Sequence, residues 1–105
     1  MFDALDKLFA TIAARKGADP SESYTAKLLA AGVEKCAKKF GEEATEAVIA
    51  AIKKDKIELA KESADVLYHL LVLWAASGIT PDDVDAVLKA REGMSGLEEK
   101  ASRKG

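Results

Sequence analysis

The sequence predicts an all-α fold, a bundle of four or five helices that a second copy of the chain completes. Apolar residues recur at every third or fourth position through most of the 105 residues, and no segment alternates apolar and polar residues as a strand does. In residues 66–74 apolar side chains cover nearly the whole circumference of the helix, a pattern typical of burial on every side. Because five short helices can hardly enclose such a segment, we expect a homodimer formed through it.

The expected helices span residues 2–16, 24–31, 33–54, 56–77 and 81–91. Gly17 and Gly78 supply the left-handed conformation that commonly ends a helix. Ser23 caps the second helix, and Thr80 caps the fifth, whose first position is Pro81. These signals place every predicted helix between a recognisable start and a recognisable end.

Length and composition indicate one small domain, residues 1–91, and a charged tail, residues 92–105, that we expect to be mobile or loosely docked. With 16 basic and 18 acidic residues the net charge is −2, which does not favour nucleic acid or an anionic membrane as a partner. The longest apolar run, residues 70–76, is too short to span a bilayer. The lone cysteine, Cys36, fits a reducing compartment. We therefore expect a cytoplasmic protein.

The third and fourth helices each combine an apolar face with an acidic edge. The apolar face of the third helix consists of Val33, Cys36, Ala37, Phe40, Ala44, Ala47, Val48 and Ala51. That of the fourth consists of Ile57, Ala60, Ala64, Leu67, Leu71 and Trp74, with Glu58, Glu62, Asp65 and His69 on the side away from it. We expect both apolar faces to belong to the core.

The acidic residues stand at spacings that destabilise a helix unless a cation binds. Glu43 and Glu46 lie three residues apart on the third helix, and Glu62 and Asp65 lie three apart on the fourth. Like charges so placed cost roughly 0.2–0.5 kcal/mol per pair. Mg²⁺ prefers oxygen ligands from carboxylates and substrate phosphates. If the two helices pack antiparallel, the four carboxylates face one another with Lys39 further along the groove, which predicts a site for a metal ion and a polyphosphate.

Each of these acidic patterns also has a simpler interpretation. A helix rich in glutamate is usually a solvated surface, and Lys39 with Glu43 would make an ordinary i,i+4 ion pair. The chain would then be a helical dimerisation or adaptor module without enzymatic activity. The clustering of like charges argues against this interpretation, and a titration with Mg²⁺ or Mn²⁺ distinguishes the two.

Four blocks of sequence, in order, resemble the phosphoribosyl-ATP pyrophosphohydrolase family, within the all-α MazG-like nucleoside triphosphate pyrophosphohydrolases. The blocks are SYTAKLLAAG at 23–32, KFGEEATEA at 39–47, ESADVLYHLLVL at 62–73 and REGMSGLEEKASRK at 91–104. The resemblance implies hydrolysis of phosphoribosyl-ATP to phosphoribosyl-AMP and pyrophosphate in histidine biosynthesis, with Mg²⁺ as cofactor and Mn²⁺ as a substitute. Within the same chemistry, the alternative is a housecleaning enzyme that hydrolyses other nucleoside triphosphates.

The resemblance also implies roles for individual residues. The candidate metal ligands are Glu43, Glu46, Glu62 and Asp65, and together with Glu42, which would orient a water molecule or support the ligands, they are the candidate catalytic residues. Lys39, His69 and Arg91 are candidates for contact with the substrate. Each of these three has an equally good structural explanation: a solvated lysine, a histidine in a local hydrogen bond, and an anchor for the tail.

Overall fold

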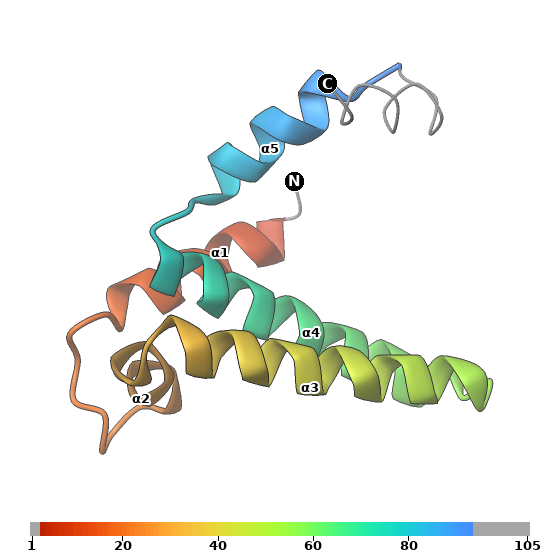
Figure 1. Ribbon diagram of the computed structural model, residues 1–105, viewed down its shortest axis with the longest axis horizontal. Coiled ribbons are helices and arrows are strands. Elements are labelled where there is room, and N and C mark those ends of the chain that lie inside the picture. The colour runs from red at the N-terminus through yellow and green to blue at the C-terminus, as the bar shows by residue number, and fades with distance from the viewer. Residues whose placement is uncertain (1–2, 94–105) are drawn as a thin grey trace.

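The computed structural model describes residues 3–93, which form five α-helices and, within that range, no strand (Figure 1). The helices are α1 (Asp3–Ala14), α2 (Tyr24–Ala31), α3 (Val33–Ile52), α4 (Lys56–Ser77) and α5 (Pro81–Ala90). The all-α prediction is confirmed, and the predicted bounds of α2 and α4 agree with the structure. α1, α3 and α5 end one to two residues earlier than predicted, and the predicted first residue of α1, residue 2, lies outside the described residues. The predicted tail lies outside the described residues from position 94 onward.

α3 and α4 form a long antiparallel hairpin around which the other helices are arranged (Figure 1). In the turn, Lys54 adopts a positive φ of 60°, which ends α3 earlier than predicted. Asp55 then starts α4, because its side chain accepts a hydrogen bond from the backbone N–H of Glu58 at 3.0 Å. The hairpin brings the acidic edges of the two helices opposite each other.

The core lies at the end of the hairpin where α1 and α2 pack. It consists of Ile12, Leu28, Cys36, Leu71, Val72 and Ala75, with further apolar side chains around them. The Cys36 thiol donates a hydrogen bond to the Leu28 carbonyl at 3.2 Å, which joins α3 to α2. The hydroxyl groups of Thr25 and Tyr68 also hydrogen-bond, which joins α2 to α4. The short helix α2 is therefore held against both arms of the hairpin.

The C-terminal half of α4 is covered in part by helices of its own chain. α1, α2 and α3 of the same chain pack around this half, and Val72 has no exposed surface. Leu67 is still 37% exposed, so part of the apolar circumference is left uncovered by the described chain. Dimerisation through α4 stays a prediction.

The apolar faces predicted for α3 and α4 are core only near α1 and α2. Toward the turn they are bare: Val48 is 56% exposed and Ile57 74%, because no other described helix reaches that end of the hairpin. The acidic stripe of α4 faces α3, as the predicted opposition of the carboxylates requires. Glu62 is half-buried and His69 is buried, which the spacing alone does not indicate.

α5 leaves the bundle after a bend of 105° from α4 (Figure 1). A capping box starts it: the Thr80 side chain accepts from the Asp83 N–H, and the Asp83 carboxylate accepts from the Thr80 N–H. None of its residues is buried. In the described part of the chain no helix by itself has the length and hydropathy to cross a membrane, and only the bent pair of α4 and α5 meets that test together.

Candidate active site

Three carboxylates converge where the acidic edges of α3 and α4 meet. One oxygen each from Glu43, Glu62 and Asp65 lies within 4.8 Å of the others. Around an octahedral Mg²⁺ ion with oxygens about 2.1 Å from the metal, neighbouring oxygens are roughly 3.0 Å apart and opposite ones roughly 4.2 Å. Side-chain rotations that draw the three oxygens together would let these residues share one cation. Glu43 comes from α3 and the other two from α4, as the sequence predicts.

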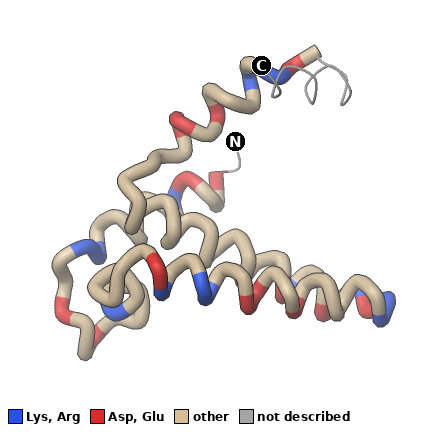
Figure 2. Tube along the Cα trace, viewed as in Figure 1, with Lys and Arg blue, Asp and Glu red and all other residues tan. Residues whose placement is uncertain are grey.

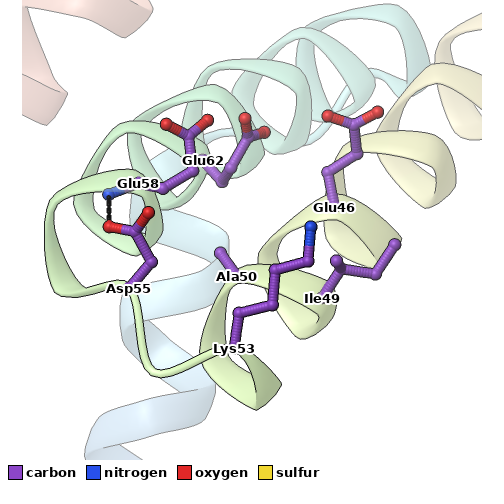
Figure 3. A pocket seen from close by; sticks show the side chains of 7 residues that line it. All are labelled: Glu46, Ile49, Ala50, Lys53, Asp55, Glu58 and Glu62. Carbon is purple, nitrogen blue, oxygen red and sulfur yellow. Dashed lines mark hydrogen bonds between the residues drawn. The ribbon is translucent and has the colours of Figure 1, made fainter.

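Glu46, the fourth predicted ligand, lies beside this cluster rather than within it. It lines a neighbouring pocket together with Glu58 and Glu62 (Figure 3). Its negative charge still raises the pKa of Glu62. The four predicted carboxylates are thus brought to one edge of the hairpin, but three of them make the converging group.

The pocket beside Glu46 has a volume of about 400 Å³ and lies toward the turn of the hairpin. Its lining residues are Glu46, Ile49, Ala50, Lys53, Asp55, Glu58 and Glu62. Figure 3 shows Glu46 and Lys53 on one side and Glu58 and Glu62 on the other. Sequence reasoning gave no role to Lys53, although its position seven residues after Glu46 places it on the same face of the helix.

Glu62 belongs to both groups of carboxylates. Its Oε2 atom is buried and makes no hydrogen bond with the described residues. Loss of solvation, a contact with Glu58 and the charges of Glu46 and Asp65 raise the pKa of Glu62 from its ordinary value of 4.5 to about 7. An unsatisfied oxygen among like charges is the environment that a bound cation would relieve.

Lys39 lies one turn before Glu43 on α3, and its ammonium forms an ion pair with Glu42 at 3.2 Å. This pair, together with the nearby Tyr24, raises the pKa of Lys39. The i,i+4 pair with Glu43 that the simpler interpretation expected is therefore not the one that forms. Glu42 is taken up by the lysine and is not part of the converging group.

His69 is enclosed on the α2 side of the carboxylates, with 6% of its surface exposed. The rings of Tyr24 and Tyr68 approach it edge-on, with centroids 6.4 and 4.9 Å away. Burial lowers the pKa of His69, and the charge of Glu43 opposes this shift. Its Nδ1 atom is buried without a hydrogen bond, so the local hydrogen bond that would explain it structurally is not made at this atom.

Arg91 caps the C-terminal end of α5 and is exposed. Because α5 leads away from the hairpin, the structure does not bring this residue to the carboxylates of its own chain (Figure 1). Figure 2 shows that the acidic residues near the turn lie along the hairpin with basic residues to either side. Lys39 is the nearest basic residue before the predicted ligands on α3, and Lys53 is the nearest one after them.

Comparison with known proteins identifies the family of this chain. The family model for phosphoribosyl-ATP pyrophosphohydrolase matches residues 5–92. The phosphoribosyl-ATP pyrophosphatase of Cereibacter sphaeroides is 64% identical over 99 residues, which cover 94% of this chain and 96% of the relative. That of Paracoccus denitrificans is 64% identical over 100 residues, 95% of this chain and 93% of the relative. The predicted resemblance is thus confirmed, and the chain belongs to the phosphoribosyl-ATP pyrophosphohydrolase family.

Proposed function

We propose that this chain hydrolyses phosphoribosyl-ATP to phosphoribosyl-AMP and pyrophosphate in histidine biosynthesis, using Mg²⁺, or Mn²⁺ in its place. The observation that carries the proposal is the convergence of Glu43, Glu62 and Asp65, where Glu62 also has a buried oxygen without a hydrogen-bond partner among the described residues. Relatives that match nearly the full length of this chain are named for this substrate. A hard cation with oxygen ligands is the group that such a donor set fits.

The reaction breaks the anhydride bond between the nucleoside monophosphate and the pyrophosphate. A bound cation would neutralise the charge that develops on the phosphate oxygens. Glu43, Glu62 and Asp65 would hold it, and Glu46 is placed to complete the ligand set or to hold a water molecule. The remaining carboxylate, Glu42, would act indirectly by fixing the ammonium of Lys39.

Three further residues are proposed to contact the substrate. Lys39 and His69 flank the carboxylates on the α2 side, where a bound nucleotide would extend beyond the metal. Arg91 is the weaker candidate, because α5 carries it away from the hairpin of its own chain. The unsatisfied Nδ1 atom supports a functional role for His69.

We also propose that two copies associate through an apolar surface near the turn. We define this hairpin surface by its exposed members: Val48, Ile52 and Ile57. Monomeric proteins rarely leave so many large apolar side chains exposed together, and a homodimer is the commonest way to cover them. A cytoplasmic location is supported by the phosphorylated substrate and by Cys36, a free and buried thiol.

The test is pyrophosphate release from phosphoribosyl-ATP, measured with and without Mg²⁺, in a matched pair of variants. Asp65→Asn removes one charge from the converging group while keeping its shape, so we expect kcat to fall at least about 100-fold. Asp85→Asn makes the same change on α5, where the side chain pairs only with Lys89, and should leave kcat unchanged.

Each alternative predicts a different result. Near wild-type turnover in Asp65→Asn at saturating Mg²⁺ would refute the assigned site. Equal or faster hydrolysis of common nucleoside triphosphates would identify a housecleaning enzyme instead. An adaptor module would show no specific binding of Mg²⁺ or Mn²⁺ in a calorimetric titration.

A further inference from the structure

The converging carboxylates lie between two regions of different chemistry along the groove of the α3–α4 hairpin. Because the helices are antiparallel, Lys39 and His69 lie on one side of them, and Lys53 and Glu58 lie on the other, toward the turn. Lys39 and Lys53 are 14 residues apart on α3, a span of about 21 Å along the helix. This length accommodates a nucleotide laid along the groove with its reacting anhydride at the carboxylates.

We propose that these two regions fix the direction of the substrate. The pyrophosphate part lies in the pocket near the turn, against Lys53, and the nucleoside part lies toward α2, against Tyr24. The inference rests on the proposed function for the identity of the substrate. It adds two binding residues, Tyr24 and Lys53, and a direction along the groove.

Lys53 makes the pocket near the turn suitable for pyrophosphate. Its ammonium is the only cationic group that lines the pocket of about 400 Å³, and Figure 3 shows it extending toward the space beside Glu46. Among the described residues it forms no ion pair, in contrast to Lys39. With Glu46, Glu58 and Glu62 around it the pocket is negatively charged overall. Pyrophosphate should therefore enter only together with divalent cations.

Tyr24 makes the region near α2 suitable for a purine. It is 54% exposed although aromatic, and its ring meets that of His69 edge-on. The residues on either side of it in the sequence are both held. The Ser23 side chain accepts a hydrogen bond from the Ala26 N–H, and the Thr25 hydroxyl hydrogen-bonds with that of Tyr68. An exposed aromatic face held in place in this way can stack against a nucleobase.

If the substrate bound in the opposite direction, each of its ends would meet surroundings of unsuitable chemistry. The purine would lie among carboxylates, and the pyrophosphate would face two tyrosines and a histidine whose pKa is lowered by burial. Lys39 alone could not balance the charge of pyrophosphate there, because Glu42 already pairs with it. Lys39 is better suited to bind the single phosphate of the phosphoribosyl group. That group is the part of the substrate that ATP does not have.

The experiment is calorimetric titration of the Mg²⁺-loaded protein with each product, pyrophosphate and phosphoribosyl-AMP. Lys53→Met should weaken pyrophosphate binding at least about tenfold and leave phosphoribosyl-AMP within about twofold, the loss expected for one charge-assisted contact. Tyr24→Leu should do the reverse. Lys38→Met, an exposed lysine of α3 outside the pocket, and Tyr24→Phe, which keeps the aromatic face, are the matched controls and should bind both products as the wild type does.

The reversed pattern would overturn the direction, and variants that lose both products or neither would overturn the two subsites. Circular dichroism of each variant verifies that the fold is kept. Turnover of phosphoribosyl-ATP by the wild type tests the proposed function separately. An active enzyme without the predicted pattern loses only this inference, whereas the predicted pattern without turnover contradicts only the proposed function. A protein that binds neither product overturns both.

Discussion

Glu62 keeps one carboxylate oxygen out of water while Glu58, Glu46 and Asp65 surround it with like charge. The folded chain therefore holds the Glu62 proton more tightly than the unfolded chain, with a pKa of about 7 against 4.5. Between these two values the folded state binds more protons than the unfolded state. The stability that this group contributes is present below pH 4.5, is lost as the pH rises toward 7, and is constant above it.

We expect Glu62→Gln to remove this pH dependence in the metal-free protein. Its Tm should exceed that of the wild type at pH 8, and its decline between pH 4.5 and 7 should be shallower. Thermal melting in the presence of a chelator measures both, with Glu22→Gln in the exposed loop before α2 as the control. Added Mg²⁺ should raise the Tm of the wild type more than that of Glu62→Gln. If the Tm of Glu62→Gln changed with pH in the same way as the Tm of the wild type, this explanation would be contradicted.

His69 shows that helical spacing can group a residue with a site correctly without indicating how deeply it is buried. Its spacing with Glu62 and Asp65 correctly groups it with the acidic stripe. Helical periodicity alone cannot tell which side of the helix receives a neighbour. The side that looked polar faces α3, so His69 is buried between Tyr24 and Tyr68 next to the carboxylates.

Among the described helices α2 is the shortest, and it is held by its buried residues Ala26 and Leu28 and by hydrogen bonds to its neighbours. The hydrogen bond between Thr25 and Tyr68 connects its first turn to α4. We expect Tyr68→Phe to lower the free energy of unfolding by about 1 kcal/mol. Because Tyr24 would lose part of its support, the affinity for phosphoribosyl-AMP should fall as well.

A double-mutant cycle with Thr25→Val isolates this contact. Denaturant unfolding of the wild type, both single variants and the double variant gives the coupling energy between the two hydroxyls. We expect the double variant to be little less stable than either single variant. Fully additive losses would show that the two hydroxyls act independently.

Capping residues predicted where the helices begin and end better than helical spacing predicted which faces of the helices are buried. The ends of α2 and α4 follow from Ser23, Asp55 and Gly78, whose effects act within one turn of the helix. Burial depends instead on where other helices dock. α1 and α2 reach only one end of the hairpin, so Val48 and Ile57 have the spacing of core residues and yet are exposed.

The same distinction applies to the site. Antiparallel packing and a spacing of three residues were enough to predict that Glu43 would meet Glu62 and Asp65. The separation of Glu46 from that group depends on the rotation of α3 against α4 and on side-chain conformation. Lys53 follows no acidic motif, and its proximity to Glu58 exists only because the chain turns back at residues 53–55.

For the whole molecule, the hairpin surface is the main feature that one chain leaves unexplained. It includes Ile52 and Ile57, which are 75% and 74% exposed on either side of the turn. A shallow apolar hollow of about 310 Å³, formed by residues such as Ala51 and Leu59, lies next to them. Covering these side chains would remove apolar area from water at about 25 cal/mol per Å². A second copy can do this with the same surface on both sides.

We therefore expect the wild type to sediment as a dimer at micromolar concentration and the double variant Ile52→Glu, Ile57→Glu to sediment as a folded monomer. The charges should prevent association without unfolding the chain, because both side chains are largely exposed in the single chain. Leu71→Ala is the contrasting variant: Leu71 is 2% exposed in the core, so its truncation should lower stability by about 2–5 kcal/mol without a specific effect on assembly. Sedimentation of the wild type as a well-folded monomer would rule out the dimer, and a dimeric double variant would place the interface elsewhere on the molecule.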